Sequence, residues 1–426
     1  MAVTILFVVF GVLLLLGVPV AFSLAASSLA TVLYLGLPTL VVVQQTAAGA
    51  SVTTLIAIPL FIFAGEMMMR GGISDRLIAL AASLVGRLRG GLGQINVLSS
   101  LFFGGVSGSA VADVSAIGGT MIPQMIQRGF DRDFAVSVTV SAAIVALLVP
   151  PSHNLILYSA SAGGGISISD LFAAGIVPAL LLTVVLMITA GIMARRRNYG
   201  TEAFPGFRAV ASRFIGALPG LLLVGVIFGG IRGGVFTAVE SASIAVVYAV
   251  AITAVVYRNL TFQNFVAACA GAVRTTGLIL FVIGAAASFG WLLAYLEVPT
   301  AAVKLLTGVA SDKNVVLLMM IGMLLVLGTF IDLAPLIIIC TPIFLPVARA
   351  VGIDPVHFGV ILILKGGLGL ITPPIGSVLF VGAAIGRISI GEVLKTIWPF
   401  YLAVLVVLLI VAFVPELSLW LPAALK

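Results

Sequence analysis

Residues 149–152 read Val149-Pro150-Pro151-Ser152, and residues 372–375 read Thr372-Pro373-Pro374-Ile375. Each Pro-Pro pair lies within a long apolar run, which covers 134–162 in the first case and 357–385 in the second. Consecutive prolines remove backbone N–H donors and clash with the preceding helical turn, so an ordinary helix does not continue through them. The sequence therefore predicts two broken helices, each composed of two half-helices.

Two further apolar stretches, 93–128 and 314–350, are too long for one membrane helix and are interrupted near their middle. The interruptions read Gly104-Gly105-Val106-Ser107-Gly108-Ser109 and Gly328-Thr329-Phe330-Ile331-Asp332. Irregular backbone at membrane depth is tolerated only where it is buried in protein or lines a cavity. Each stretch is therefore predicted to be a re-entrant hairpin, in which two half-helices meet at a polar tip.

Hairpin and broken helix recur in the same order, which indicates an internal repeat. The positions that match at an offset of 223 residues are Gly105 with Gly328, Pro123 with Pro346, Asp131 with Asp354, and Pro150-Pro151 with Pro373-Pro374. With one residue of slip, Ile166-Ser167-Ile168 matches Ile388-Ser389-Ile390. Ordinary helix bundles do not produce such a collinear set, so the chain is predicted to contain two related units.

The composition indicates an all-α protein that crosses a membrane many times. Of 426 residues, 62% are hydrophobic and 8% are charged, whereas a soluble domain carries roughly 25% charged residues. The opening stretch lacks the basic start of a signal peptide and is predicted to be a retained helix. Cys269 and Cys340 lie in apolar runs and predict neither a disulfide nor a metal site. About ten full spans are expected, over 3–22, 23–42, 52–69, 134–162, 171–194, 214–230, 235–257, 275–296, 357–385 and 393–415.

The basic residues predict how the two units are oriented. If Arg195-Arg196-Arg197 is cytoplasmic, 15 of the 21 Lys and Arg residues fall on that side. Two of these 15 lie in the segment 258–274, which is counted as a cytoplasmic loop. Five fall on the other side, Lys426 among them, and Lys365 lies inside a span. This asymmetry fits the positive-inside rule and makes the two units inverted. The bases form no patch with interleaved aromatic residues, so the net charge of +7 does not indicate nucleic-acid binding.

The expected organisation follows from these features. It comprises scaffold helices over 1–70, a connector over 71–92, a first unit over 93–194, a second scaffold segment over 195–297, a connector over 298–313, a second unit over 314–415 and a tail over 416–426. Inverted repeats with broken helices are typical of secondary transporters, which hold substrate and coupling ions where the breaks meet.

The broken helices suggest the chemistry of such a site. Half-helix C-termini offer free carbonyls, which suit a desolvated Na⁺, and half-helix N-termini offer free N–H groups, which suit a carboxylate. Each unit should provide one cation site. The candidates are Gly105, Ser107, Ser109 and the break 149–152 in the first unit, and Gly328, Thr329, Asp332 and the break 372–375 in the second.

Ionisable residues inside spans are costly and are often functional. Asp332, at the second tip, is expected to bind a cation or to shape the substrate pocket. For Asp113 and Glu240, structural pairing is as good an interpretation as a functional one. His153 and Asn154 are expected either to face substrate or to cap a half-helix. Glu66 and Arg70 are spaced as a helix-end ion pair.

The chain resembles the large membrane subunit of tripartite ATP-independent periplasmic (TRAP) transporters. The motifs that carry the resemblance are Ser107-Gly108-Ser109-Ala110-Val111-Ala112-Asp113, Val149-Pro150-Pro151-Ser152, Gly328-Thr329-Phe330-Ile331-Asp332 and Gly369-Leu370-Ile371-Thr372-Pro373-Pro374-Ile375-Gly376. The resemblance implies Na⁺-driven uptake of an organic acid across the bacterial inner membrane, delivered by a periplasmic binding protein. It also implies an elevator motion of the hairpin units and a separate small membrane subunit of about four helices.

The resemblance further implies which residues bind sodium. Gly328, Gly369, Thr372 and Ile375 correspond to the family's sodium-site positions, and the repeat offset adds Gly105, Ala146, Val149 and Ser152 as their counterparts in the first unit. No cofactor is expected besides Na⁺ as the coupling ion. The candidates for substrate binding are Ser107, Ser109, Asn154, Thr329, Asp332 and Lys365.

Lys365 departs from the family pattern, in which a small polar residue such as Asn is common at this position. Its ammonium is expected to pair with Asp332, to neutralise the substrate carboxylate, to replace a bound Na⁺, or to extend to an aqueous cavity. The sequence leaves these four interpretations open.

Two other functions remain as alternatives. A stand-alone Na⁺/organic-anion symporter would bind free substrate without a delivery protein. An ion-conducting subunit of a membrane enzyme complex would need a file of charged residues along several spans, and the charges here gather at the second unit. The chain lacks a phosphate-binding Gly-Lys-Ser/Thr loop and a hydrolytic constellation, so it is not expected to be an enzyme.

Overall fold

The computed structural model describes residues 1–310 and 312–425, and every regular element in these residues is helical. Residue 311, in the second connector, and Lys426, counted above on the outer side, lie outside the described residues. The helices are α1 (Ala2–Leu15), α2 (Val20–Tyr34), α3 (Leu40–Ala50), α4 (Ala57–Arg70), α5 (Ile73–Val85), α6 (Gly91–Ser107), α7 (Ala110–Asp113), α8 (Gly119–Gln127), α9 (Arg132–Ala142), α10 (His153–Ser161), α11 (Ile168–Arg196), α12 (Phe207–Arg232), α13 (Ala238–Ala251), α14 (Phe262–Tyr295), α15 (Val298–Val309), α16 (Lys313–Phe330), α17 (Leu333–Ala350), α18 (Pro355–Leu370), α19 (Ser377–Gly386), α20 (Ile390–Thr396), α21 (Trp398–Phe413) and α22 (Glu416–Ala424). Short 3-10 or π-helical turns occupy Thr53–Ile56, Val114–Gly118, Ala143–Leu147 and Ile252–Val256.

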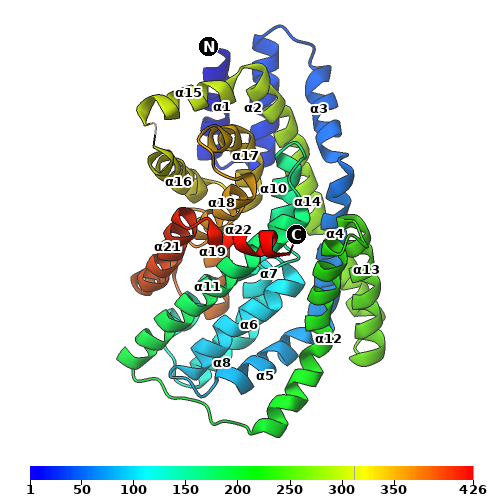
Figure 1. The fold of residues 1–426 in the computed structure, drawn as a ribbon, viewed down its shortest axis with the longest axis vertical. Coiled ribbons are helices and arrows are strands. Elements are labelled where there is room, and N and C mark those ends of the chain that lie inside the picture. The colour runs from blue at the N-terminus through cyan, green and yellow to red at the C-terminus, as the bar shows by residue number, and fades with distance from the viewer. Residues whose placement is uncertain (311, 426) are drawn as a thin grey trace.

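The scaffold combines helices that are distant in sequence. Helix α1 packs against α2, α14 packs along α2, α3 and α4, and α13 packs against α4. Helix α12 contacts α5 and α13, and Figure 1 shows it as a long helix at the lower right of the molecule. With 34 residues, α14 is about 51 Å long, so one helix can contact both the outer scaffold helices and the centre of the protein.

Positions matched by the sequence repeat occupy the same places in the two units. Asp131 and Asp354 are the N-cap residues of α9 and α18, and Ser167 and Ser389 are the N-cap residues of α11 and α20. Gly105 and Gly328 lie in the last turn of α6 and α16. Both Pro–Pro bonds, Pro150–Pro151 and Pro373–Pro374, are cis. The structure therefore confirms the predicted repeat of a hairpin followed by a broken helix.

The two units lie head to tail and interlock. Figure 1 shows α6 and α8 of the first hairpin in the lower half of the molecule and α16 and α17 of the second in the upper half. Between them α9 packs against α19 and α20, α10 packs against α17, and α11 packs against α21 and α22. This arrangement confirms the predicted all-α membrane fold with two opposed units.

Several predicted spans have different bounds in the structure. The first was expected to cover 3–22, but α1 ends at Leu15 because Gly17 adopts a positive φ and Pro19 follows. The second, expected over 23–42, ends at Tyr34 before Gly36 and Pro38. The last, expected over 393–415, is divided between α20 and α21. Glycine and proline thus end helices inside apolar runs that hydropathy alone joins together.

Helix lengths also lower the number of full spans. In residues 1–310 and 312–425, seven helices are long and apolar enough to cross a membrane, or nine if each of two bent pairs counts as one span. About ten were expected. Five of the expected spans are absent from the seven, because α1 and α2 are shorter than 18 residues and the runs 134–162, 357–385 and 393–415 are divided between shorter helices. The seven include α16 and α17, which have 18 residues each and were expected as the arms of the second hairpin rather than as full spans.

An ion-pair cluster at helix ends joins the two units. The Arg197 guanidinium donates to both Asp133 carboxylate oxygens at 2.9 Å, and the Thr396 hydroxyl donates to Asp133 as well. Burial alone would raise the pKa of Asp133, but the hydrogen bonds from Arg197, from Thr396 and from the Phe134 N–H outweigh it and lower the pKa to about 2. The cluster connects α9 and the end of α11 to α20.

Candidate functional site

One cavity is lined by both hairpin tips. Its volume is about 450 Å³, which suits a small organic molecule. The first unit contributes Ser107, Ser109, His153 and Asn154, the second contributes Asp332, Leu333 and Leu370, and the scaffold helices α4 and α14 contribute Glu66, Arg274 and Thr275. The cavity therefore lies where the two units face the scaffold.

At the first tip, the end of α6 packs directly on the first break. Gly108 has a φ of +59°, and a methyl group added there would lie 2.5 Å from the Pro151 carbonyl oxygen. The Asn154 side-chain amide donates to the Gly108 carbonyl oxygen at 3.3 Å. Asn154 therefore holds the tip against the start of α10, a contact that differs from the half-helix cap the sequence offered, and it also lines the cavity.

The predicted first-site residues lie together around this contact. A methyl group on Gly105 would lie 3.4 Å from both the Pro150 carbonyl oxygen and the Val149 side chain. One on Gly104 would lie 2.7 Å from the Ala146 Cα. Ser152 is fully buried, and its hydroxyl has no hydrogen-bond partner among the described residues.

The second tip packs on the second break in the same way. A methyl group on Gly369 would lie 2.5 Å from the Gly328 carbonyl oxygen. The Ile375 N–H donates to the Thr329 carbonyl oxygen at 3.3 Å. The Thr372 hydroxyl, just past the end of α18, donates to the Leu368 carbonyl oxygen at 2.6 Å. The break and the tip are thus in direct contact, as the sequence predicted.

In each unit two helix C-termini converge. The last turn of α6 meets the end of the first half-helix near residue 146, and the last turn of α16 meets the end of α18 near residue 369. Carbonyls in the last turn of a helix lack intrahelical donors, and the helix dipole makes this end negative. Both points are suited to bind a cation.

Asp332 and Lys365 do not pair. Asp332 is exposed to the cavity, and its carboxylate accepts a hydrogen bond from the Ser377 hydroxyl at 3.0 Å. Lys365 is fully buried in α18, and its ammonium has no hydrogen-bond partner in residues 1–310 and 312–425. The ammonium lies instead against Gly328. Pairing of Lys365 with Asp332, one of the four interpretations left open by the sequence, is therefore wrong.

The remaining ionisable residues have separate roles. Glu66 and Arg70 form the predicted ion pair at 3.2 Å, and the Glu66 carboxylate also lies against Gly271 of α14. Asp113 is buried and accepts a hydrogen bond from the Ser100 hydroxyl at 2.7 Å. Glu240 completes a capping box with Thr237 at the start of α13, which is a structural role.

The sequence missed the scaffold wall of the cavity. Arg274 was counted in a cytoplasmic loop, with the next span expected over 275–296. Helix α14 instead begins at Phe262, where the Thr261 hydroxyl accepts a hydrogen bond from the Asn264 N–H at 3.1 Å. Arg274 therefore lies well inside a helix and lines the cavity. A cap residue followed by unbroken helical sequence was the signal that would have identified it.

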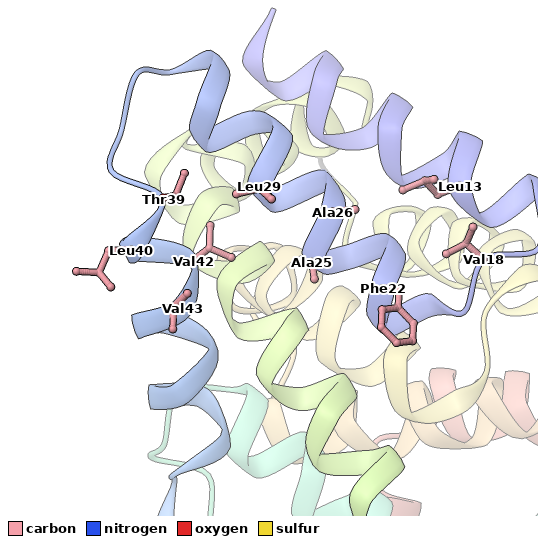
Figure 2. A pocket seen from close by; sticks show the side chains of 10 residues that line it. All are labelled: Leu13, Val18, Phe22, Ala25, Ala26, Leu29, Thr39, Leu40, Val42 and Val43. Carbon is pink, nitrogen blue, oxygen red and sulfur yellow. The ribbon is translucent and has the colours of Figure 1, made fainter.

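A second hollow lies between α1, α2 and the start of α3, as Figure 2 shows. Its volume is about 580 Å³, and every lining residue except Thr39 is apolar. Such a surface offers nothing to hold a charged group. The polar cavity at the hairpin tips is therefore the candidate functional site.

Comparison with known proteins agrees with this architecture. The family model for the tripartite ATP-independent periplasmic transporter, DctM component, matches residues 7–417. The chain is 37% identical to the sialic acid TRAP transporter large permease protein of Vibrio cholerae, covering 96% of each chain. It is 35% identical to the isethionate TRAP transporter permease protein of Oleidesulfovibrio alaskensis, covering 98% of this chain and 66% of that one.

A solved structure shares the fold. The YdaH transporter of Alcanivorax borkumensis superposes with a TM-score of 0.62 over 88% of this chain and 87% of that one, at 17% identity. The relatives in sequence are named as permeases, so this chain is a multi-pass membrane transport protein and not an enzyme. It belongs to the DctM family, the large permease proteins of tripartite ATP-independent periplasmic transporters.

Proposed function

We propose that the chain imports a small organic acid across the bacterial inner membrane, driven by Na⁺ and supplied by a periplasmic binding protein. The observation that carries this proposal is the cavity in which both hairpin tips meet the scaffold. A site shared by two opposed units can be opened to either side of the membrane by a movement of those units, as alternating access requires.

The cavity has features that suit a carboxylate. Helix α10 begins at His153 and α17 begins at Leu333, so the N-termini of two helices lie at the cavity wall. Free N–H groups at such ends favour anions. Arg274, which forms no ion pair with the described residues, supplies a positive charge from the scaffold side. The carboxylate of a dipolar or anionic organic acid would bind to the free N–H groups and to the Arg274 guanidinium.

Sodium coupling is supported by the convergent helix C-termini and by energetics. Moving one negative charge inward against an inside-negative potential of 100 mV costs about 2.3 kcal/mol. For a monocarboxylate, one co-transported Na⁺ cancels this cost, and two or more reverse it, because the membrane potential then drives a net positive charge inward. Desolvated carbonyls at the two tip–break contacts supply the oxygen ligands that a small hard cation requires.

We propose an elevator motion for the two units. Helices α9, α10 and α11 of the first unit interlock with α17 and α19–α21 of the second, so the units can move as one body. The cavity lies between this body and the scaffold helices α4 and α14. A rigid displacement of this body along the scaffold would carry the site from one side of the membrane to the other.

Partner subunits are also proposed. The isethionate permease is longer than this chain, which covers only 66% of it. The unmatched third leaves room for a fused small membrane subunit, and we expect a separate chain of this kind here. A periplasmic binding protein would deliver the substrate, whose identity among organic acids depends partly on that protein.

Reconstitution in proteoliposomes tests the proposal. The purified chain, its small membrane subunit and the cognate binding protein are supplied with radiolabelled organic acids that stabilise the binding protein. Uptake is expected only with an inward Na⁺ gradient and only with the binding protein present. Full uptake of free substrate without the binding protein would favour the stand-alone symporter, and uptake that ignores Na⁺ would contradict sodium coupling.

A further inference from the structure

Lys365 is the unexplained charge of the second unit. Its side chain is fully buried within α18, and its ammonium has no hydrogen-bond acceptor among the described residues. Burying an ammonium without compensation is costly, because the charge loses its hydration. The side chain keeps its charge only where the surrounding protein supplies negative potential.

The position of the ammonium identifies the source of that potential. A methyl group built on Gly328 would overlap the Lys365 ammonium and lie 3.3 Å from its Cε carbon. Gly328 is in the last turn of α16, and its carbonyl oxygen faces Gly369 in the last turn of α18. Each helix C-terminus carries about half a negative charge. The ammonium thus lies where two negative helix ends meet.

The other interpretations of Lys365 do not fit this geometry. The Asp332 carboxylate bonds to Ser377 and forms no ion pair with Lys365. Lys365 is not among the residues that line the cavity, and with no exposed surface it reaches neither a substrate there nor an aqueous space.

We propose that the Lys365 ammonium is a built-in cation that takes the place of Na⁺ in the second unit. The residue at the corresponding position of the first unit is Ala142, which is buried and uncharged. The first unit therefore keeps its place for an exchangeable ion, and the second does not. This inference rests on the proposed sodium coupling and specifies how many ions it uses.

The consequence is a weaker coupling to sodium. A tethered ammonium moves with the hairpin unit in both directions of the cycle, so it adds no net charge movement. One fewer Na⁺ then enters with each substrate, and the uptake rate depends less steeply on Na⁺ concentration. Uptake would then continue at sodium concentrations too low to fill two sites.

Sodium-dependent stability of the full chain tests this without knowledge of the substrate. The purified protein in detergent is titrated with NaCl against choline chloride at constant ionic strength, and the unfolding midpoint is followed. Lys365→Ala and Lys365→Asn open the space and remove the charge. Both are expected to raise the Hill coefficient of the sodium response from about one to about two. Lys365→Met removes the charge but keeps the bulk, which still fills the space for an ion. The Hill coefficient of its sodium response should therefore stay at the wild-type value, while its unfolding midpoint falls.

Binding of radioactive sodium to the unmodified chain provides a measurement that no folding defect can obscure. About one ion per chain is expected, and two per chain would overturn the inference. An unchanged coefficient in the folded Lys365→Ala and Lys365→Asn variants would overturn it as well. If the wild type neither binds sodium nor responds to it, the sodium coupling of the proposed function fails instead, and a response that appears only in the Lys365 variants would still support the built-in cation.

Discussion

The carbonyl oxygen of Gly328 lies where a side chain on Gly369 would have to be placed, only 2.5 Å from the position of a methyl group. The contact joins the hairpin tip to the broken helix, so glycine at residue 369 sets how closely these two elements approach.

Gly369→Ala should separate the second tip from its break. The added methyl group meets backbone rather than a flexible side chain, so we expect a loss of about 1–3 kcal/mol in stability and of most transport activity. Gly322→Ala in α16 is the matched control, because nothing lies within 4 Å of the added group. Unfolding of both variants followed by scanning fluorimetry would check this, and equal midpoints would contradict the contact.

Asp332→Asn should remove the negative charge at the second tip while leaving the local structure intact. The amide oxygen can still accept the Ser377 hydrogen bond, so stability should change by no more than about 1 kcal/mol. A negative charge that faces the cavity is lost, so KM for an anionic substrate should fall. Asp312→Asn, at the N-cap of α16, is the control. A shift of similar size in that variant would show that the effect is not specific to the cavity.

Arg274→Gln should weaken substrate binding. Removing the guanidinium from the scaffold wall of the cavity is expected to raise KM for the organic acid about tenfold, which corresponds to about 1.4 kcal/mol. The control is Arg208→Gln, an exposed residue in the first turn of α12 that does not line the cavity. Initial rates of uptake in proteoliposomes give both values. Unchanged KM for Arg274→Gln would remove this residue from the proposed site.

Acid should loosen the cluster that connects the two units. The folded protein holds the pKa of Asp133 at about 2, below the ordinary value of 3.8. A carboxyl group with a lowered pKa stabilises the fold above its unfolded pKa and loses that contribution as pH falls through the folded value. We therefore expect stability to decline between about pH 4 and about pH 2.

Asp133→Asn should remove that part of the pH dependence and lower stability at neutral pH. Asp75→Asn is the control, since Asp75 is exposed and forms no ion pair with the described residues. Unfolding midpoints of both variants and the wild type, measured across this pH range, would show how much Asp133 contributes to the pH dependence of stability. A profile for Asp133→Asn that follows the wild type would mean that the ion pair with Arg197 does not stabilise the protein.

Much of the candidate site could be predicted because its parts are local. Glycine-rich tips and Pro-Pro breaks interrupt helices wherever they occur, and their recurrence at one offset places them in corresponding positions. Helix ends were less predictable. The early end of α1 at Leu15 and the early start of α14 at Phe262 depend on a positive φ and on a side-chain cap, which average hydropathy does not register.

The sequence by itself determined the repeated hairpins, the broken helices and the tip–break pairing, because backbone stereochemistry and hydrophobic length act over a few residues. Only the tertiary structure decided the partners of the charged side chains. It placed Arg274 on the cavity wall and Lys365 against Gly328 rather than Asp332. It also placed Thr396 with Asp133. Such contacts join segments far apart in the chain, and helix packing decides which of the available partners each charge meets.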